Sequence, residues 1–199
     1  MKVKIKKLGK TESFSLINSW SDVTLETWLS LIDFETGTKT EEATETIAAL
    51  SDIPKKLIKE LSLSDVAVIM SKVGELQAKQ DTKLKRIIEI NDVEYGFHPD
   101  LDSISLGEYA DIEQFIKNGI DKQLPELMSV LYRPVKLKKN DIYIIDAYDG
   151  DIRLRAEEMK QMSAEQVQSA LVFFYTLGKV LSEILPLYLM EKLKETKTQ

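Results

Sequence analysis

The spacing of apolar positions predicts that helices dominate this chain. In "SWSDVTLETWLSLI", the apolar residues from Leu25 to Ile32 return to one helical face behind a cap at Ser21 or Asp22. The same reasoning predicts further helices over residues 41–50, from Pro54 to Leu61, from a Ser64 cap to Leu76, from near Ser103 to Gly119, over "LPELMSVLYRP" up to Pro134, and from Ser163 onward. The last begins with a capping-box pattern in which Gln166 follows Ser163 by three residues.

Short segments with β-branched or alternating residues predict strands between these helices. The start "MKVKIKK" alternates lysine with apolar side chains, which favours an edge strand over Lys2–Lys7. Residues 86–95 contain two short strands around a turn at Asn91 and Asp92, and "IYIIDAY" predicts another strand over residues 142–148, followed by the turn "YDGD". The predicted fold class is therefore α+β and mainly helical.

The chain divides into two predicted units. Residues 1–80 form a mainly helical unit with an N-terminal strand, and residues 81–199 form a helical unit with short strands and a long C-terminal helix. Placing Leu25 over Leu106 also aligns Trp28 with Tyr109, which predicts two related units with these aromatics at equivalent core positions. Two unrelated capped helices would give similar matches, and a single shared core also fits, so these alternatives stay open.

Composition and charge narrow the classes of partner. The 199 residues carry 27 Lys+Arg and 33 Asp+Glu, a net charge of -6, so neither nucleic acid nor an anionic membrane is an expected partner. The absence of cysteine excludes disulfides and thiol chemistry. The most apolar stretch, residues 170–190, contains Lys179, Glu183 and Pro186, which favours a buried amphipathic helix over a membrane span.

The sequence offers few groups for chemistry, and we expect neither a cofactor nor a metal. His98 is the single histidine, next to a proline, and we predict a surface or turn position for it. The acidic run "DAYDGD" lacks the closing glutamate of a calcium loop, so we interpret it as a turn. Arg133 precedes Pro134 after an apolar helix, where a guanidinium either binds a partner's carboxylate or pairs with an acid of its own chain.

A second apolar set follows Pro186, where the long C-terminal helix is predicted to kink or end. Its members are Leu187, Leu189, Met190 and Leu193, flanked by charged residues and a polar tail. If the set projects from the fold, it needs a partner, as an amphipathic helix does in a groove. If it folds back, it belongs to the core. We therefore list it with Arg133 as the candidate partner-binding residues.

Several segments together resemble small proteins encoded among the tail and virion genes of tailed bacteriophages. These are "VTLETWLSL" or "ISLGEYADIE", "LMSVLYRPV", "YIIDAYDG" and "ALVFFYTLGKVL". The resembled families include tail-assembly chaperone-like and baseplate-assembly proteins and virion-associated proteins of crAss-like phages, and the likeness is best over residues 104–185. The resemblance implies a non-enzymatic protein that binds other phage structural or tail proteins, with self-association as a further expectation. It also implies a place in the virion, as a structural or packaged cargo protein, or in the host cytoplasm.

Two alternatives to a virion component remain from the sequence. The first is a transient tail-assembly chaperone. The second is a small enzyme whose site is assembled from Arg133 and the acidic residues Asp146, Asp149 and Asp151, because neighbouring carboxylates can perform acid–base chemistry.

Overall fold

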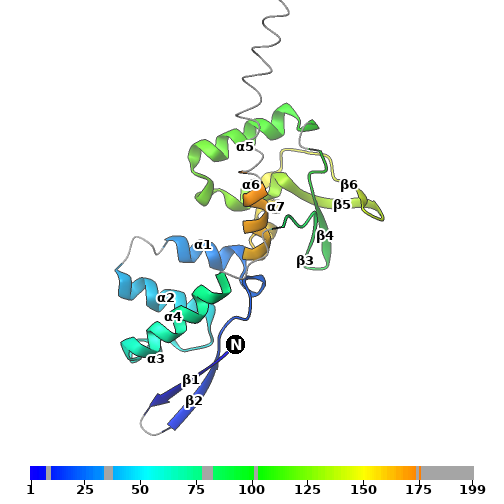
Figure 1. Cartoon of the computed structure of the whole chain (residues 1–199). Coiled ribbons are helices and arrows are strands. Elements are labelled where there is room, and N and C mark those ends of the chain that lie inside the picture. The colour runs from blue at the N-terminus through cyan, green and yellow to red at the C-terminus, as the bar shows by residue number, and fades with distance from the viewer. Residues whose placement is uncertain (8–9, 34–37, 78–82, 101–102, 174, 176–199) are drawn as a thin grey trace, which may run out of the picture.

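The fold is α+β and mainly helical, as the sequence predicts, and contains two small antiparallel sheets (Figure 1). The computed structural model describes residues 1–7, 10–33, 38–77, 83–100, 103–173 and 175. Within these ranges, none of the helices combines the length and apolar character that a membrane crossing requires.

The N-terminal group of elements builds one hydrophobic core. Its elements are β1 (Lys2–Lys7), β2 (Lys10–Ser15), the 3-10 helix η1 (Trp20–Asp22), α1 (Leu25–Asp33), α2 (Lys39–Leu50), α3 (Lys55–Ile58) and α4 (Leu63–Gln77). β1 and β2 pair antiparallel, and the inward side chains Val3 and Ile5 of β1 are buried. Ile47 and Leu50 of α2 and Ile69 of α4 are fully enclosed in the same cluster, as their helical spacing predicts.

The C-terminal group surrounds a four-stranded antiparallel sheet in the order β3-β4-β5-β6. Its elements are β3 (Ile87–Ile90), β4 (Val93–Phe97), α5 (Leu106–Asn118), the 3-10 helix η4 (Ile120–Lys122), α6 (Leu124–Leu131), β5 (Tyr132–Lys139), β6 (Ile142–Ile145), α7 (Ile152–Met159) and a helix over 164–173. Asn91 and Asp92 both have positive φ, 50° and 63°, as expected for a tight turn whose twist matches a hairpin. The predicted strand-turn-strand at this position is confirmed.

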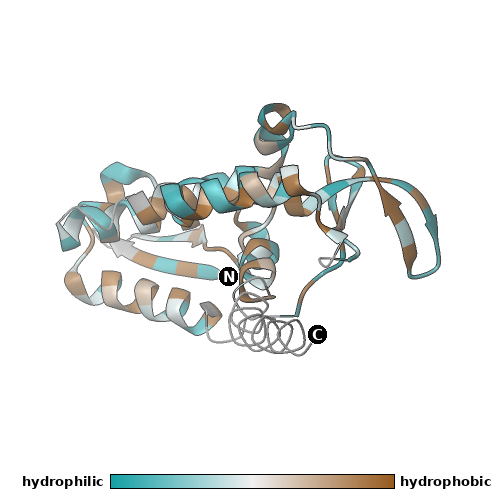
Figure 2. Ribbon diagram, turned by 90° about the horizontal axis from the view of Figure 1, so that it is seen from above, coloured by the Kyte–Doolittle hydropathy of each residue, from teal (hydrophilic) through white to brown (hydrophobic). Residues whose placement is uncertain are grey.

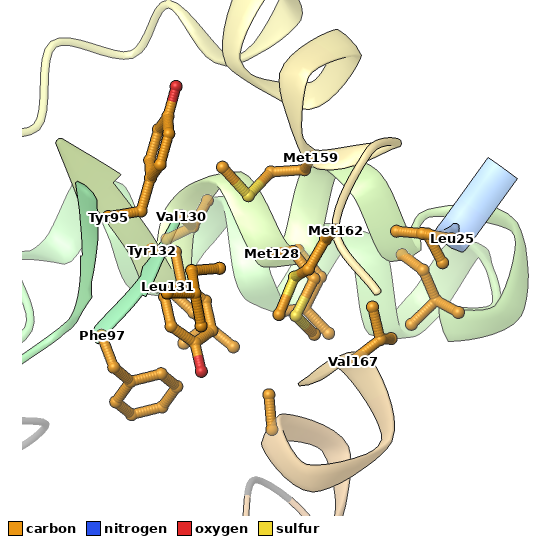
Figure 3. Packing of buried hydrophobic residues seen from close by; sticks show 14 of the residues in the cluster. Leu25, Tyr95, Phe97, Met128, Val130, Leu131, Tyr132, Met159, Met162 and Val167 are labelled. Carbon is orange, nitrogen blue, oxygen red and sulfur yellow. The ribbon is translucent and has the colours of Figure 1, made fainter. Parts of the chain in front are cut away.

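Helix α6 is the centre of the second core. Its Leu124, Leu127 and Met128 are completely buried. Figure 3 shows Met128 beside Met162, with Leu25 of α1 and Val167 of the last described helix close by. An α1 residue therefore packs in the core of the C-terminal group, and Ala164 reciprocally packs in the core of the N-terminal group.

The two groups are joined where two helices begin. Thr24 and Ser163 form an isolated antiparallel bridge, and each precedes the first residue of a helix. The Leu25 amide donates to the Met162 carbonyl and the Ala164 amide donates to the Val23 carbonyl, each at 2.7 Å. The first turn of a helix leaves amides without helical partners. Each segment therefore supplies a hydrogen-bond acceptor for the first amide of the other helix.

Two predicted helix starts are wrong by two or three residues. α1 is capped by Thr24, whose Oγ1 accepts from the Thr27 amide, instead of by Ser21 or Asp22. α4 is capped by Ser62, whose hydroxyl accepts from the Asp65 amide, instead of by Ser64. In both regions several Ser, Thr and Asp residues stand together, and the sequence does not indicate which of them adopts the extended cap conformation.

The helix predicted to reach Pro134 ends at Leu131, and Pro134 lies inside β5 opposite Tyr95. A proline cannot donate to a strand ladder, but it is tolerated beside a bulge. The β5–β6 register shifts between Val135 and Leu137, directly after the proline, which explains how the strand accommodates it. β2 was not predicted, because "KTESFS" has one large apolar residue and therefore little hydrophobic alternation.

The aligned helix starts of the predicted repeat lie in unlike surroundings. Leu25 is 0% exposed whereas Leu106 is 84% exposed. Trp28 packs against both hydrophobic clusters, but Tyr109 is exposed. The expected equivalence of Trp28 and Tyr109 in two copies of one unit is therefore wrong at these positions.

Candidate functional site

Among the predicted partner-binding residues, only Arg133 falls within the described part of the chain. Leu187, Leu189, Met190 and Leu193 lie outside the described residues. Arg133 is 4% exposed, and its Nη1 lies 2.7 Å from Oε1 of Glu108. Of the two interpretations of this arginine, the contacts favour a pair with an acid of its own chain.

Glu108 owes its position to the first turn of α5. Its Oε2 accepts a hydrogen bond from the Ser105 amide at 2.7 Å, and its own amide donates to the Ser105 hydroxyl, which together form a capping box. Burial alone would raise the pKa of the Glu108 carboxyl, but the Ser105 hydrogen bonds and the charge of Arg133 outweigh it, so this pKa lies below its usual value. One oxygen therefore caps the helix while the other faces the arginine.

His98 also reaches this carboxylate, and its predicted surface or turn position is wrong. The side chain is buried, and Nε2 lies 3.5 Å from Oε1 of Glu108. The His98 amide donates to the Leu131 carbonyl at 2.7 Å, which ties the segment after β4 to the end of α6. Burial lowers the pKa of the His98 imidazole more than Glu108 raises it, and Arg133 lowers it further, so the neutral form is favoured.

Tyr148, which is partly buried, extends this polar network to Asp111. Its ring centroid lies 5.8 Å from the guanidinium carbon of Arg133, within the range of a cation–π contact, and its hydroxyl donates to Oδ2 of Asp111. Burial, and then the hydrogen bond to Asp111, raise the pKa of the Tyr148 hydroxyl. We define the Glu108 network as His98, Glu108, Asp111, Arg133 and Tyr148. It draws on β5, α5 and the segments after β4 and β6, so it fastens α5 to the sheet.

Two of the three acids proposed for an enzyme site, Asp146 and Asp149, have other partners. Asp146 pairs with Lys136 and Asp149 pairs with Arg155, each at 3.0 Å. The structure therefore places Arg133 with Glu108 instead of with these acids. In the described ranges, no three His, Asp or Glu side chains are grouped so that they could hold a metal ion.

A shallow, open depression of about 360 Å³ lies along the surface of α4. The described residues that line it are Ser64, Ala67, Val68, Ser71, Lys72 and Glu75. All of them belong to one helix, and small-molecule sites typically have polar groups converging from several elements. The depression is consequently a weaker candidate than the surface described next.

The distal part of the β5–β6 hairpin, residues 135–145, extends beyond the strand pairing with β4, and we call it the arm. β4 pairs with β5 only from Tyr132 to Pro134, so the arm is paired within itself (Figure 1). Leu137 lies opposite Ile144, and Ile142 follows on the same face. These side chains are 67%, 56% and 77% exposed, respectively. This outer face of the arm therefore presents three large aliphatic side chains to solvent.

The opposite face of the arm is firmly packed. Tyr143 and Ile145 are buried against Gly96 of β4, where a Cβ atom would lie 2.5 Å from the Tyr143 ring and 2.8 Å from a methyl of Ile145. The Tyr143 hydroxyl also donates to the Phe97 carbonyl at 2.6 Å. Gly96 is thus needed for close approach, and these contacts hold the arm in one position.

By the strand register, Lys139 shares the face of the exposed aliphatic side chains, whereas Lys138 lies opposite Tyr143 on the other face. The arm contains Lys136, Lys138 and Lys139 against a single acid, Asp141, in a chain of net charge -6. Figure 2 shows hydrophobic and hydrophilic segments side by side on this hairpin, at the right-hand end of the molecule. Two of these lysines pair with acids just outside the arm, Lys136 with Asp146 and Lys138 with Glu94.

The sequence alone indicates which residues of this hairpin share a face. The alternation in "DIYIID" already places Ile142 and Ile144 on one face of a strand and Tyr143 and Ile145 on the other. Both faces are apolar, so alternation alone does not tell which one is covered.

Comparison of the chain with protein-family models, with curated proteins and with solved structures found no match.

Proposed function

We propose that the chain is a non-enzymatic, protein-binding component of a tailed bacteriophage, associated with the virion or its tail. The observation that carries the binding role is the outer face of the arm, where Leu137, Ile142 and Ile144 are all more than half exposed. Large aliphatic side chains gathered on one exposed face commonly mark a protein-interaction site. The phage context is supported by the resemblance of several sequence segments to tail and virion proteins.

The rigidity of the arm adds support to a binding role. An interaction surface that is already ordered loses little conformational entropy when its partner binds. Packing of Tyr143 and Ile145 over Gly96 supplies that order on one face while leaving the other face free. Other phage structural or tail proteins are the partners we propose.

A site-specific crosslinking experiment tests the binding role. Ile144 is replaced by a photo-crosslinking amino acid, and the matched control carries the same amino acid at Leu154, an exposed leucine on α7. Illumination of phage-infected cells that contain each variant should crosslink position 144 to phage structural or tail proteins. Equal or absent crosslinking at the two positions contradicts the proposal.

Mass spectrometry of purified particles distinguishes the two forms of the proposal. Retention of the chain at a reproducible copy number supports a virion component. Its crosslinking during infection combined with its absence from purified particles supports the alternative, a transient tail-assembly chaperone.

A further inference from the structure

We propose that one face of the two-stranded β1–β2 ribbon binds the phosphate backbone of a nucleic acid. We call it the outer face of the ribbon, and the exposed residues Lys2, Lys4, Ser13 and Ser15 lie on it. The ribbon belongs to the N-terminal group of elements and shares no residue with the arm (Figure 1). The proposal therefore goes beyond the protein-binding role and does not depend on it.

Positive charge is concentrated in the ribbon although the chain as a whole is acidic. The first ten residues, "MKVKIKKLGK", contain five lysines and no acid, in a chain of net charge -6. The overall charge argues against attraction to nucleic acid across the whole surface. A basic patch on one face is nevertheless sufficient for local binding of phosphates.

Alternation along β1 places its lysines on the outer face. Val3 and Ile5 are buried in the hydrophobic core of the N-terminal group. Successive side chains of a strand point to opposite faces, so Lys2 and Lys4 lie on the other side, and both are exposed.

The second strand adds hydroxyl groups to the same face, because residues directly opposite each other in an antiparallel pair share a face. The register pairs Lys2 with Ser15, Lys4 with Ser13, and Lys6 with Thr11. Ser13 and Ser15 are exposed. The outer face therefore combines ammonium and hydroxyl groups, and both kinds of group can donate hydrogen bonds.

The acids near the ribbon do not neutralise this face. Glu12, the one acid of the two strands, lies opposite Ile5 and therefore on the other face. Asp52 accepts from the Ser15 amide at 2.7 Å, and a strand amide lies in the plane of its sheet, so this carboxylate is at the edge of β2. Within the described part of the chain, Lys2 and Lys4 form no ion pair.

This combination of groups favours phosphate over an acidic protein or an anionic membrane. Lys, Ser and Thr are among the side chains that commonly donate to the phosphate oxygens of nucleic acids. Protein interfaces usually have an apolar centre, and basic membrane-binding faces usually insert apolar side chains beside their charges. The apolar residues of β1 are instead buried on the other side of the ribbon.

The outer face also lacks the groups that most often recognise bases. Arginine and amide side chains read base edges, and aromatic side chains stack on unpaired bases. None of these types occurs in the register pairs of this face. We therefore expect binding that depends on phosphates and is independent of base sequence.

Fluorescence anisotropy with short labelled DNA of mixed sequence tests the proposal on the full chain. Single-stranded and duplex probes are titrated at several salt concentrations. The variant Lys2→Gln/Lys4→Gln should weaken binding of every sequence about tenfold or more at low salt. It should also make the slope of log affinity against log salt concentration less steep, by about 0.7 for each lost phosphate contact with a single strand and about 0.9 with a duplex.

Two further variants separate the face from the net charge of the chain. Lys136→Gln/Lys138→Gln removes the same two charges from the arm, where both lysines already pair with acids, and should leave the affinity nearly unchanged. Ser13→Glu keeps all lysines but places a carboxylate opposite Lys4, and should weaken binding about tenfold. All substituted side chains are exposed, so unchanged circular dichroism and melting temperature would establish that each variant is folded.

Several results would overturn the proposal. The first is absence of DNA binding at low salt, and the second is a loss in the arm variant as large as in the ribbon variant. Tighter binding of polyglutamate or of phosphatidylserine vesicles than of DNA, with the same dependence on Lys2 and Lys4, would assign the face to an acidic protein or a membrane instead. A strong preference for one base sequence would refute recognition through phosphates alone. Crosslinking at position 144 is a separate readout, so the protein-binding role stands or fails independently.

Discussion

The pair between Glu108 and Arg133 provides the sharpest test of how the fold is held together. Both residues are almost completely buried, at 3% and 4% exposure, with 2.7 Å between Oε1 and Nη1. Replacing Glu108 by Gln keeps an oxygen that can accept from the Ser105 amide, but removes the negative charge beside the arginine. With that oxygen kept on Ser105, the amide nitrogen faces Nη1 of Arg133, so the substitution keeps the cap and replaces the ion pair with two facing donors.

The expected loss of stability is large. Removing one partner of a buried ion pair leaves an uncompensated charge and typically costs about 3–5 kcal/mol. The Nε of Arg133 already lacks a hydrogen-bond partner within the described part of the chain, so the guanidinium has little alternative compensation. We expect the free energy of unfolding to fall by about 3 kcal/mol in Glu108→Gln, toward the lower end because the side chain keeps its shape.

Urea unfolding followed by circular dichroism measures this change. The matched control is Glu113→Gln on the exposed face of the same helix, where the carboxylate pairs with Lys117 at 3.0 Å. An exposed pair four residues apart on a helix contributes only about 0.3–0.5 kcal/mol. Comparing the loss of unfolding free energy in Glu108→Gln with that in Glu113→Gln therefore shows how much burial adds to the cost of the same substitution.

A double-mutant cycle checks that the loss belongs to the pair. Replacing Arg133 by Met removes the buried cation, so Glu108→Gln should cost less in that background, with a coupling of about 0.5–3 kcal/mol. The reasoning fails if Glu108→Gln destabilises no more than Glu113→Gln, or if the effects of Glu108→Gln and Arg133→Met simply add.

Three further predictions use other parts of the fold. Because the pKa of His98 is lowered in the folded state, the unfolded chain binds more protons near pH 6.5, so the free energy of unfolding should be highest above this pH and decrease as the pH falls toward the folded-state pKa. Urea unfolding at several pH values should show this decrease. The same pH dependence in the variant His98→Gln would refute the prediction. Gly96→Ala should lose about 1–3 kcal/mol through overpacking against Tyr143, and a thermal shift near zero would contradict the close contact. Ser62→Ala should lose about 1 kcal/mol as a helix cap while Ser64→Ala loses little, and the reverse order in thermal unfolding would restore the cap predicted from sequence.

Local chemistry in the sequence was sufficient to predict several features of the fold. The capping box of Ser163 and Gln166 forms as predicted, with hydrogen bonds of 3.0 and 3.2 Å. The turn at Asn91 and Asp92 and the strand Lys2–Lys7 are also found where the pattern placed them. These features depend on residues only a few positions apart, so the sequence contains nearly all of the interactions that determine them.

The candidate site was less accessible from the sequence, because it depends on which faces other elements cover. Alternation separated Ile144 from Tyr143, but only the packing of β4 determines that Tyr143 is inside and Ile144 is outside. Similarly, nothing near His98 in the sequence indicates that Glu108 and Arg133 enclose it. Such contacts join residues that are distant in the chain.

Leu25 and Leu106 show most clearly which features local sequence determines and which depend on tertiary packing. Each is the first residue of a helix and directly follows a Thr or Ser that caps it, so the local sequence predicts similar structure for both, and both helices form. Leu25 is nevertheless fully buried, because α1 begins against the segment from Lys160 to Met162, whereas Leu106 is exposed. Periodicity and capping determine where a helix forms and which residues share a face. Whether that face is buried depends on the free energy of packing it against another element, and only the tertiary structure brings that element into contact.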